Sequence, residues 1–229
     1  MRLGVLMIIT SGKPHIAPSV LSWLEQGHFD IVPISPLITG AEAAAIFDGI
    51  DGLYIHPGYA GVQMHSAVDR MAHTLLTMAH EAFKKGRHFP VWGTCYGFQQ
   101  IIKFIGRMTE LESFHSKNYH SQMRIVPNTI SRLFRYSERF QIKQISVPFF
   151  DHMEGLTIQG FNDNRSLRSA FRILGVASDR QHKDYVALIE GKRMPWYGCQ
   201  FHPELHRPVS NTSWMVEFIG AELGRKMTV

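Results

Sequence analysis

Residues 90–101 constrain the fold of this chain more than any other stretch, and they read Pro-Val-Trp-Gly-Thr-Cys-Tyr-Gly-Phe-Gln-Gln-Ile. The short apolar run from Pro90 to Trp92 has the character of the end of a buried strand, and two glycines flank a cysteine in the tight turn that follows. Beyond the turn, apolar residues recur at the spacing of one helix face, at Phe98, Ile101, Ile102 and Ile105. The pattern therefore predicts a strand-to-helix elbow.

Cys95 stands at the centre of this elbow, where small neighbours on either side tolerate a cramped backbone because they lack a clashing Cβ. We expect its side chain to project into solvent at the top of a sheet. A helix N-terminus favours a thiolate, and the next backbone N–H, that of Tyr96, is placed to stabilise an oxyanion. These features are typical of a nucleophile. A buried structural cysteine beside an ordinary turn is the alternative that the elbow alone leaves open.

Strands and helices alternate along the first half of the chain. Such alternation implies βαβ units, and therefore a mostly parallel sheet joined by right-handed crossovers. Functional groups in such a sheet collect at the carboxyl ends of the strands, where both the 57–61 turn and Cys95 are expected. The predicted strands are 3–9, 31–34, 52–56 and 90–92, and the predicted helices are 18–26, 41–47 and 66–85.

The second half has a different pattern. Residues 107–150 are mixed in composition and weakly periodic, so only loops and short strands are predicted there. Antiparallel strands beyond this segment would extend the sheet, and an amphipathic helix would follow them. These elements are predicted at 171–177, 185–190, 196–201 and 213–223. Because we find no repeat, low-complexity tract or linker, the simplest interpretation is one domain over residues 1–229.

A cysteine nucleophile needs a base, and His202 is the strongest candidate. It lies in Gln200-Phe-His-Pro-Glu204, which closes a predicted strand, and Pro203 prevents the regular structure from continuing. Glu204 could reach the imidazole from the same turn and hold its tautomer. Zinc bound by His202 and His206 is the alternative. Pro203 argues against one helix across both residues, and no cysteine or acidic residue has the spacing of a further ligand.

These paired motifs resemble those of a known family. Gly-Thr-Cys95-Tyr-Gly together with Gln-Phe-His202-Pro-Glu204 resembles the class I glutamine amidotransferases, whose glutaminase domains use a Cys-His-Glu triad. Nearly the whole chain is also similar to the γ-glutamyl hydrolases, which trim polyglutamate tails from folates. The resemblance implies a three-layer α/β sandwich with a mostly parallel central sheet, the flavodoxin-like fold of class I glutamine amidotransferases. The similar segments are Leu-Glu-Gln-Gly27, Ile-Val-Pro-Ile34, Ile-Asp-Gly-Leu53, Phe-Pro-Val-Trp-Gly-Thr-Cys-Tyr-Gly-Phe98 and Met-Pro-Trp-Tyr-Gly-Cys-Gln-Phe-His-Pro-Glu204.

The resemblance assigns roles by position. Cys95 would be the nucleophile, His202 the general base and acid, and Glu204 the residue that orients His202. Tyr96 and Gly58 would supply the backbone N–H groups of the oxyanion hole.

Two further positions are matched with less support. The family usually has paired glycines where this chain reads Gly58-Tyr59, and a bulky residue restricts the backbone conformations that aim an N–H inward. Tyr59 therefore puts the geometry of the oxyanion hole in question. His152 resembles a family histidine near the substrate pocket, and an ordinary surface histidine is the alternative.

The implied reaction is hydrolysis of γ-glutamyl amide bonds, most directly those of folate poly-γ-glutamates, through a thioester acyl-enzyme. It needs no metal and no organic cofactor. One alternative is a glutaminase that passes ammonia to a partner synthase, although the chain contains no synthase domain. The other is a catalytically weakened relative with a structural or folate-binding role, for which Tyr59 is the warning sign.

Cysteine content and charge limit the other function classes. Cys95 and Cys199 allow at most one disulfide, so there is no cystine framework. The apolar run 3–9 is too short for a secretion signal or a membrane span, which predicts a cytoplasmic protein without membrane association.

The formal charge of +5 suits an anionic partner only weakly, because the basic residues after position 130 lie several residues apart. We interpret them as a solvated face rather than a nucleic-acid site. The expected partner is a small-molecule substrate, and a homodimer would be ordinary for the family. The residues concerned are Arg132, Arg135, Arg139 and Lys143.

Overall fold

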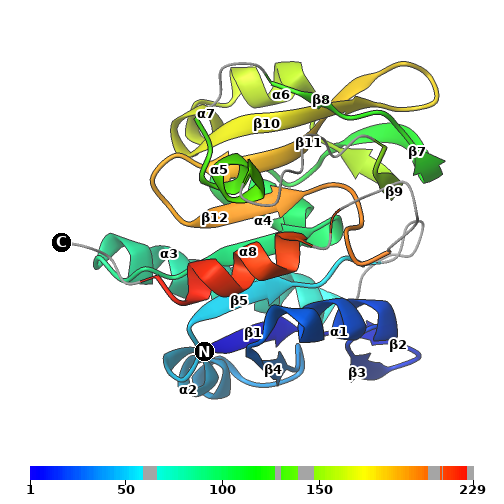
Figure 1. Cartoon of the computed structure of the whole chain (residues 1–229). Coiled ribbons are helices and arrows are strands. Elements are labelled where there is room, and N and C mark those ends of the chain that lie inside the picture. Colours follow the sequence, from blue (N-terminus) through cyan, green and yellow to red (C-terminus); the bar gives the residue numbers. More distant parts are fainter. Residues whose placement is uncertain (59–65, 127–129, 139–146, 206–211, 213, 226–229) are drawn as a thin grey trace.

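The protein is described here by a computed structural model, whose described residues are 1–58, 66–126, 130–138, 147–205, 212 and 214–225. An eight-stranded sheet with the order β4-β1-β5-β6-β12-β11-β10-β8 forms its centre (Figure 1). The five strands from β4 to β12 run parallel, and β11, β10 and β8 continue the sheet in antiparallel fashion. The mostly parallel sheet inferred from the sequence is confirmed.

Every element predicted in the first half is present. The strands are β1 (Arg2–Leu6), β4 (Asp30–Ile34), β5 (Gly52–Ile55) and β6 (Val91–Thr94). The helices are α1 (Pro18–Leu24), extended by a 3-10 turn at Glu25–Gly27, then α2 (Gly40–Asp48), α3 (Ser66–Lys84) and α4 (Tyr96–Gly106). Pro33 lies in β4 at the sheet edge, where a missing N–H is tolerated.

The predicted strands of the second half also form. They are β10 (Phe171–Ser178), β11 (Asp184–Gly191) and β12 (Trp196–Cys199), and the closing helix is α8 (Trp214–Leu223). The segment predicted as loops and short strands holds more structure. It contains β7 (Glu112–His120), β8 (Arg124–Ile125), α5 (Arg132–Glu138) and the start of β9 (Phe149–Gly155), and two short helices follow, α6 (Ile158–Asp163) and α7 (Arg165–Ala170).

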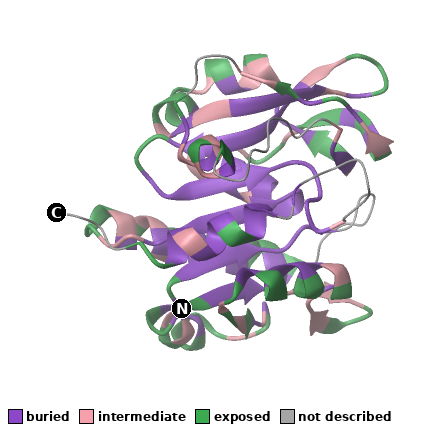
Figure 2. Ribbon diagram, viewed as in Figure 1, coloured by how far each residue is buried: buried purple, intermediate pink, exposed green. Residues whose placement is uncertain are grey.

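Helices cover both faces of the sheet, so that buried residues gather in two clusters (Figure 2). One cluster packs α2, α3, α4, α6 and α7 against the sheet, and the other packs α1, α5 and α8 against the opposite face. This three-layer arrangement agrees with the predicted sandwich. It also explains why β5 and β6 are buried throughout, because strands covered on both faces have no solvent side.

The first predicted strand, 3–9, is shorter than expected. It ends at Leu6, and Ile8–Thr10 forms β2, which pairs with β3 (Lys13–His15) in a separate hairpin. In α1, Val20, Trp23 and Leu24 are buried, whereas Leu21 is exposed. The Trp23 ring packs against Tyr54, with their centroids 6.0 Å apart.

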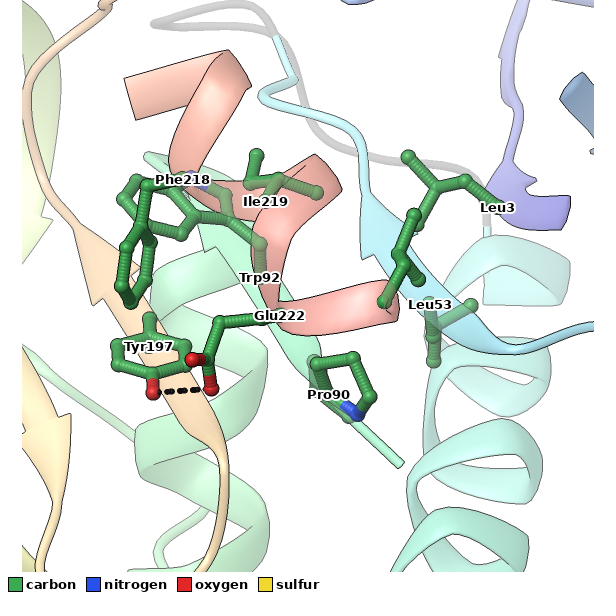
Figure 3. A pocket seen from close by; sticks show the side chains of 10 residues that line it. Leu3, Leu53, Pro90, Trp92, Tyr197, Phe218, Ile219 and Glu222 are labelled. Carbon is green, nitrogen blue, oxygen red and sulfur yellow. Dashed lines mark hydrogen bonds between the residues drawn. The ribbon is translucent and has the colours of Figure 1, made fainter. Parts of the chain in front are cut away.

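A small cavity of about 10 Å³ lies between α8 and the sheet, at the end of β5 and β6 away from Cys95 (Figure 3). The side chain of Glu222 points into this apolar region, and its Oε2 accepts a 2.7 Å hydrogen bond from the Tyr197 hydroxyl. A volume of this size holds at most one water. Glu222 is 1% exposed. None of the helices in the described part of the chain combines the length and apolarity that a bilayer crossing requires.

Candidate active site

The elbow predicted around Cys95 is present between β6 and α4. Cys95 has a φ of 48° and a ψ of −104°, a conformation that L-residues rarely adopt. Both flanking glycines are required by close approach: a Cβ on Gly93 would lie 2.5 Å from the Gly97 carbonyl, and one on Gly97 would overlap the Ile55 carbonyl. The strained position holds the cysteine at the carboxyl end of a central strand, in front of a helix N-terminus.

The Cys95 side chain is buried rather than projecting into solvent, with 5% exposure. Segments from two other parts of the chain cover it. Its Sγ lies 3.7 Å from the Asp151 carbonyl oxygen on β9, and Nε2 of Gln200 lies 3.5 Å from the same sulfur. The expectation of an exposed thiol was wrong because it treated the elbow in isolation from β9 and from the residues that follow β12.

His202 follows β12, the parallel neighbour of β6. Its Nδ1 lies 2.7 Å from Oε1 of Glu204, and both side chains are buried. The backbone N–H of His202 donates to the Phe149 carbonyl of β9 at 2.9 Å, which fixes the turn against the strand that covers Cys95. With Nδ1 occupied by Glu204, Nε2 is the ring nitrogen left to interact with Cys95.

The electrostatics of His202 favour the imidazolium. Burial alone would lower its pKa, but the Glu204 carboxylate and then Cys95 outweigh burial and hold the pKa of His202 well above its ordinary value. Cys95 therefore lies close enough to influence the ring. A protonated imidazole beside a cysteine suits an ion pair that supplies both a nucleophile and a proton donor.

The two predicted oxyanion donors follow neighbouring strands, Tyr96 after β6 and Gly58 after β5. Tyr96 is the first residue of α4, so its backbone N–H belongs to the first turn, which has no acceptor within the helix. Gly58 is buried and lies shortly after β5, the other neighbour of β6. Tyr59 lies outside the described residues, so its effect on this turn stays a prediction.

Two buried histidines surround the site. His152 on β9 is 2% exposed, not a surface residue, and its Nδ1 lies 2.9 Å from the Glu154 carbonyl. His56 follows β5, and its Nε2 accepts the Ala17 N–H at 3.0 Å. Burial is the main cause that lowers the pKa of each to about 3, so both rings are neutral at physiological pH. Both rings interact with His202 without adding a positive charge beside it.

Sequence analysis missed Gln200, Asp151 and His56. Gln200 could have been identified from sequence, because it lies in the motif of His202, between the core residues Cys199 and Phe201. Asp151 contributes its backbone carbonyl, which no side-chain pattern can reveal. His56 could have been found as a histidine at a parallel strand end.

The other readings of the cysteines and histidines find no support in the described chain. Cys95 and Cys199 are both free thiols. His206 lies outside the described residues, and elsewhere no group of three or more histidine, cysteine, aspartate or glutamate side chains is arranged to hold a metal ion.

Comparison with known proteins gives a consistent result. The sequence model of the glutamine amidotransferase class-I family matches residues 28–220. The γ-glutamyl hydrolase of Mus musculus is 29% identical over 199 residues, which cover 84% of this chain and 62% of the mouse protein. γ-Glutamyl hydrolase 1 of Arabidopsis thaliana is 29% identical over 203 residues, which cover 85% of this chain and 57% of that protein. The chain thus spans about three fifths of the length of these relatives.

Solved structures show the same fold. The glutaminase domain of Trypanosoma brucei CTPS, solved with bound acivicin, aligns with a TM-score of 0.69 at 18% identity, over 100% of this chain and 95% of that one. A glutamine amidotransferase from Thermotoga maritima aligns with a TM-score of 0.54 at 12% identity, over 96% and 81% of the two chains. The predicted fold class is confirmed.

Proposed function

Because this chain belongs to the class-I glutamine amidotransferase family, we propose that it is a cysteine hydrolase of γ-glutamyl amide bonds. The observation that carries the proposal is the meeting of Cys95, on its strained elbow, with the buried His202–Glu204 pair at neighbouring strand ends. The similarity to γ-glutamyl hydrolases supports a γ-linked substrate, and we propose poly-γ-glutamylated folate as that substrate.

The reaction we propose has two steps. The Cys95 thiolate attacks the γ-carbonyl carbon, and the Tyr96 and Gly58 N–H groups stabilise the oxyanion that forms. The C–N bond then breaks, His202 gives its proton to the departing amine nitrogen of the leaving glutamate, and a thioester remains on Cys95. A water molecule attacks the thioester and transfers a proton to His202, and the γ-carboxylate leaves as the thiolate is restored.

Glu204 orients the imidazole and stabilises its protonated form through both steps. His56 and His152 are buried and neutral near His202, so they add no positive charge to the site. Apart from the attacking water, the proposed steps use protein groups.

The test compares three substrates. Pteroyltri-γ-glutamate, a γ-glutamyl dipeptide and free glutamine are incubated with the wild-type chain and with Cys95→Ala, and the products are resolved by chromatography. Cys199→Ala is the matched control, because Cys199 is buried in the core and lies outside the elbow. We expect γ-linked substrates to be cleaved by the wild type and by Cys199→Ala, and not by Cys95→Ala.

Other outcomes favour other functions. Release of ammonia from glutamine without cleavage of γ-linked peptides would favour a glutaminase that serves a partner synthase; the Trypanosoma neighbour is itself named a glutaminase domain. Inertness toward all three substrates, with folate still bound, would favour the structural or folate-binding relative.

A further inference from the structure

A second hollow lies on the face covered by α3, α4 and α7, separate from the candidate active site. Its volume is about 590 Å³, within the range of small-molecule sites. Because α4 carries Cys95 before its first residue and the hollow meets its last turn, about 15 Å of helix separates the two. The lining residues from α3 are His73, His80, Phe83 and Lys84, those from α4 and its end are Phe104, Ile105 and Arg107, and the rest are Ser166, Ser169, Ala170, Arg193 and Met194.

The floor of this groove is apolar and aromatic. Phe83, Phe104 and Ile105 are only partly buried, and they pack against the core beneath. His73 and His80 lie edge-on to the Phe104 ring, with centroids 5.3 and 6.0 Å away. A partly exposed aromatic side chain that packs against the core offers a stacking surface for a flat ring.

The rim of the groove is positively charged. Three cations line it, Lys84, Arg107 and Arg193, and no aspartate or glutamate is among the lining residues. Lys84 is paired with Glu81 at 2.8 Å, whereas neither arginine forms an ion pair with a described residue. An uncompensated charge of one sign beside an apolar wall attracts a ligand of the opposite sign.

Arg107 has an unusual backbone. It ends α4 in the left-handed conformation, with φ 53° and ψ 45°, and its N–H donates to the Lys103 carbonyl. Glycine is the ordinary residue at this position, because a Cβ is disfavoured there. Arg107 lines the groove, and replacing it by glycine would remove its charge without straining the backbone.

We propose that this groove binds a small organic anion that carries a flat aromatic ring. The ring would stack on Phe104, and a carboxylate, sulfonate or phosphate group would pair with Arg107 and Arg193, in a groove that Ser166 and Ser169 also line. Guanidinium groups suit such anions because they donate two parallel hydrogen bonds. This site is independent of the proposed hydrolase activity.

The test uses an aryl sulfonate and its uncharged counterpart. Fluorescence titration with 8-anilinonaphthalene-1-sulfonate gives a dissociation constant, and N-phenyl-1-naphthylamine has the same rings without the charge. We expect Arg107→Gly and Arg193→Ala each to weaken sulfonate binding by about threefold to tenfold, and binding of the neutral probe to stay constant. Phe104→Ala weakens both probes.

Three controls separate this effect from folding and from the active site. Arg107→Gly should not lower Tm, because glycine suits the left-handed position. Arg135→Ala removes an exposed arginine from α5 on the opposite face, and Cys95→Ala changes the elbow. Both should bind the sulfonate as the wild type does. The proposal is overturned if neither arginine variant changes sulfonate affinity, or if Cys95→Ala abolishes it.

Discussion

The Tyr96 hydroxyl donates a 2.7 Å hydrogen bond to Oδ1 of Asp69, and this bond ties the first turn of α4 to the first turn of α3. Tyr96 follows Cys95 directly, and its side chain is 9% exposed. Burial, and then the nearby Asp69 charge, raise the pKa of Tyr96 far above its ordinary range, so the hydroxyl remains a donor. The bond therefore holds the peptide whose N–H is proposed to bind the oxyanion.

Tyr96→Phe removes this bond and keeps the ring. We expect kcat for γ-glutamyl hydrolysis to fall by about fivefold with little change in KM, because about 1 kcal/mol of orientation is lost in the transition state. Gln100→Ala is the matched control, since Gln100 Nε2 donates to the same Asp69 oxygen at 3.1 Å from the exposed side of α4. A rise in KM with unchanged kcat would contradict the positioning role.

Glu204→Gln removes the charge that faces His202 while keeping a similar shape. Because Glu204 raises the pKa of His202, this substitution lowers it, and less of the imidazole is protonated when the amine leaves. We expect kcat to fall on the order of 10²-fold and the alkaline limb of the pH–rate profile to move to lower pH. An unchanged alkaline limb would show that His202 is not the proton donor.

The positions of Cys95 and His202 at strand ends were easier to predict than the residues that cover Cys95. Gly-Thr-Cys-Tyr-Gly and Gln-Phe-His-Pro-Glu are local motifs, and each places its reactive residue at a strand end by backbone geometry alone. The cover over Cys95 comes from Asp151 on β9, whose position depends on pairing with β7. That pairing has two register shifts, and β7 is a polar strand without clear alternation, so sequence analysis could not place it.

His56 and His152 make stability depend on pH. Each has a pKa near 3 in the fold and 6.5 in an unfolded chain, so the unfolded state binds more protons between these values. The free energy of unfolding is therefore not reduced by these two histidines above about pH 6.5, and it decreases as the pH falls from 6.5 toward 3. His202 acts with the opposite sign, because its raised pKa favours the fold below pH 6.5.

Urea unfolding at pH 7.5 and pH 5.0 tests this dependence. Phenylalanine is a suitable replacement for His152, because the rings of Phe114, Phe150 and Tyr185 surround this position. We expect His152→Phe to reduce the difference in unfolding free energy between the two pH values by about 2 kcal/mol. His182→Asn is the control, since His182 is exposed and asparagine tolerates its φ of 61°. An equal pH dependence in wild type and His152→Phe would refute the assignment.

Glu190 anchors α5 to the sheet. This carboxylate on β11 is fully buried, and it accepts hydrogen bonds from the Ser131 hydroxyl at 2.6 Å and from the Arg132 and Leu133 N–H groups at 3.1 Å. Arg132 was interpreted from sequence as part of a solvated face. Instead, its guanidinium donates to the Gly191 and Met194 carbonyls at 2.8 and 2.9 Å, which closes the turn between β11 and β12.

Glu190→Ala should destabilise the protein by about 3 kcal/mol, because it leaves Arg132 half-buried without its charge partner. Hydrogen exchange should rise first in α5, while β6 and β12 stay protected. Glu217→Ala is a suitable comparison, since it removes an exposed carboxylate from α8. A uniform rise in exchange across the sheet would show that the anchor supports the whole fold and not α5 alone.

The strands β6 and β12 pair in parallel from Val91 with Trp196 to Thr94 with Cys199, although more than a hundred residues separate them along the chain. During synthesis, the cysteine is therefore made long before its histidine, and every strand from β7 to β11 must emerge between them. A chain cut short before β12 carries a thiol with no base beside it. The proposed pair of Cys95 and His202 is therefore complete only after β12 has joined the sheet.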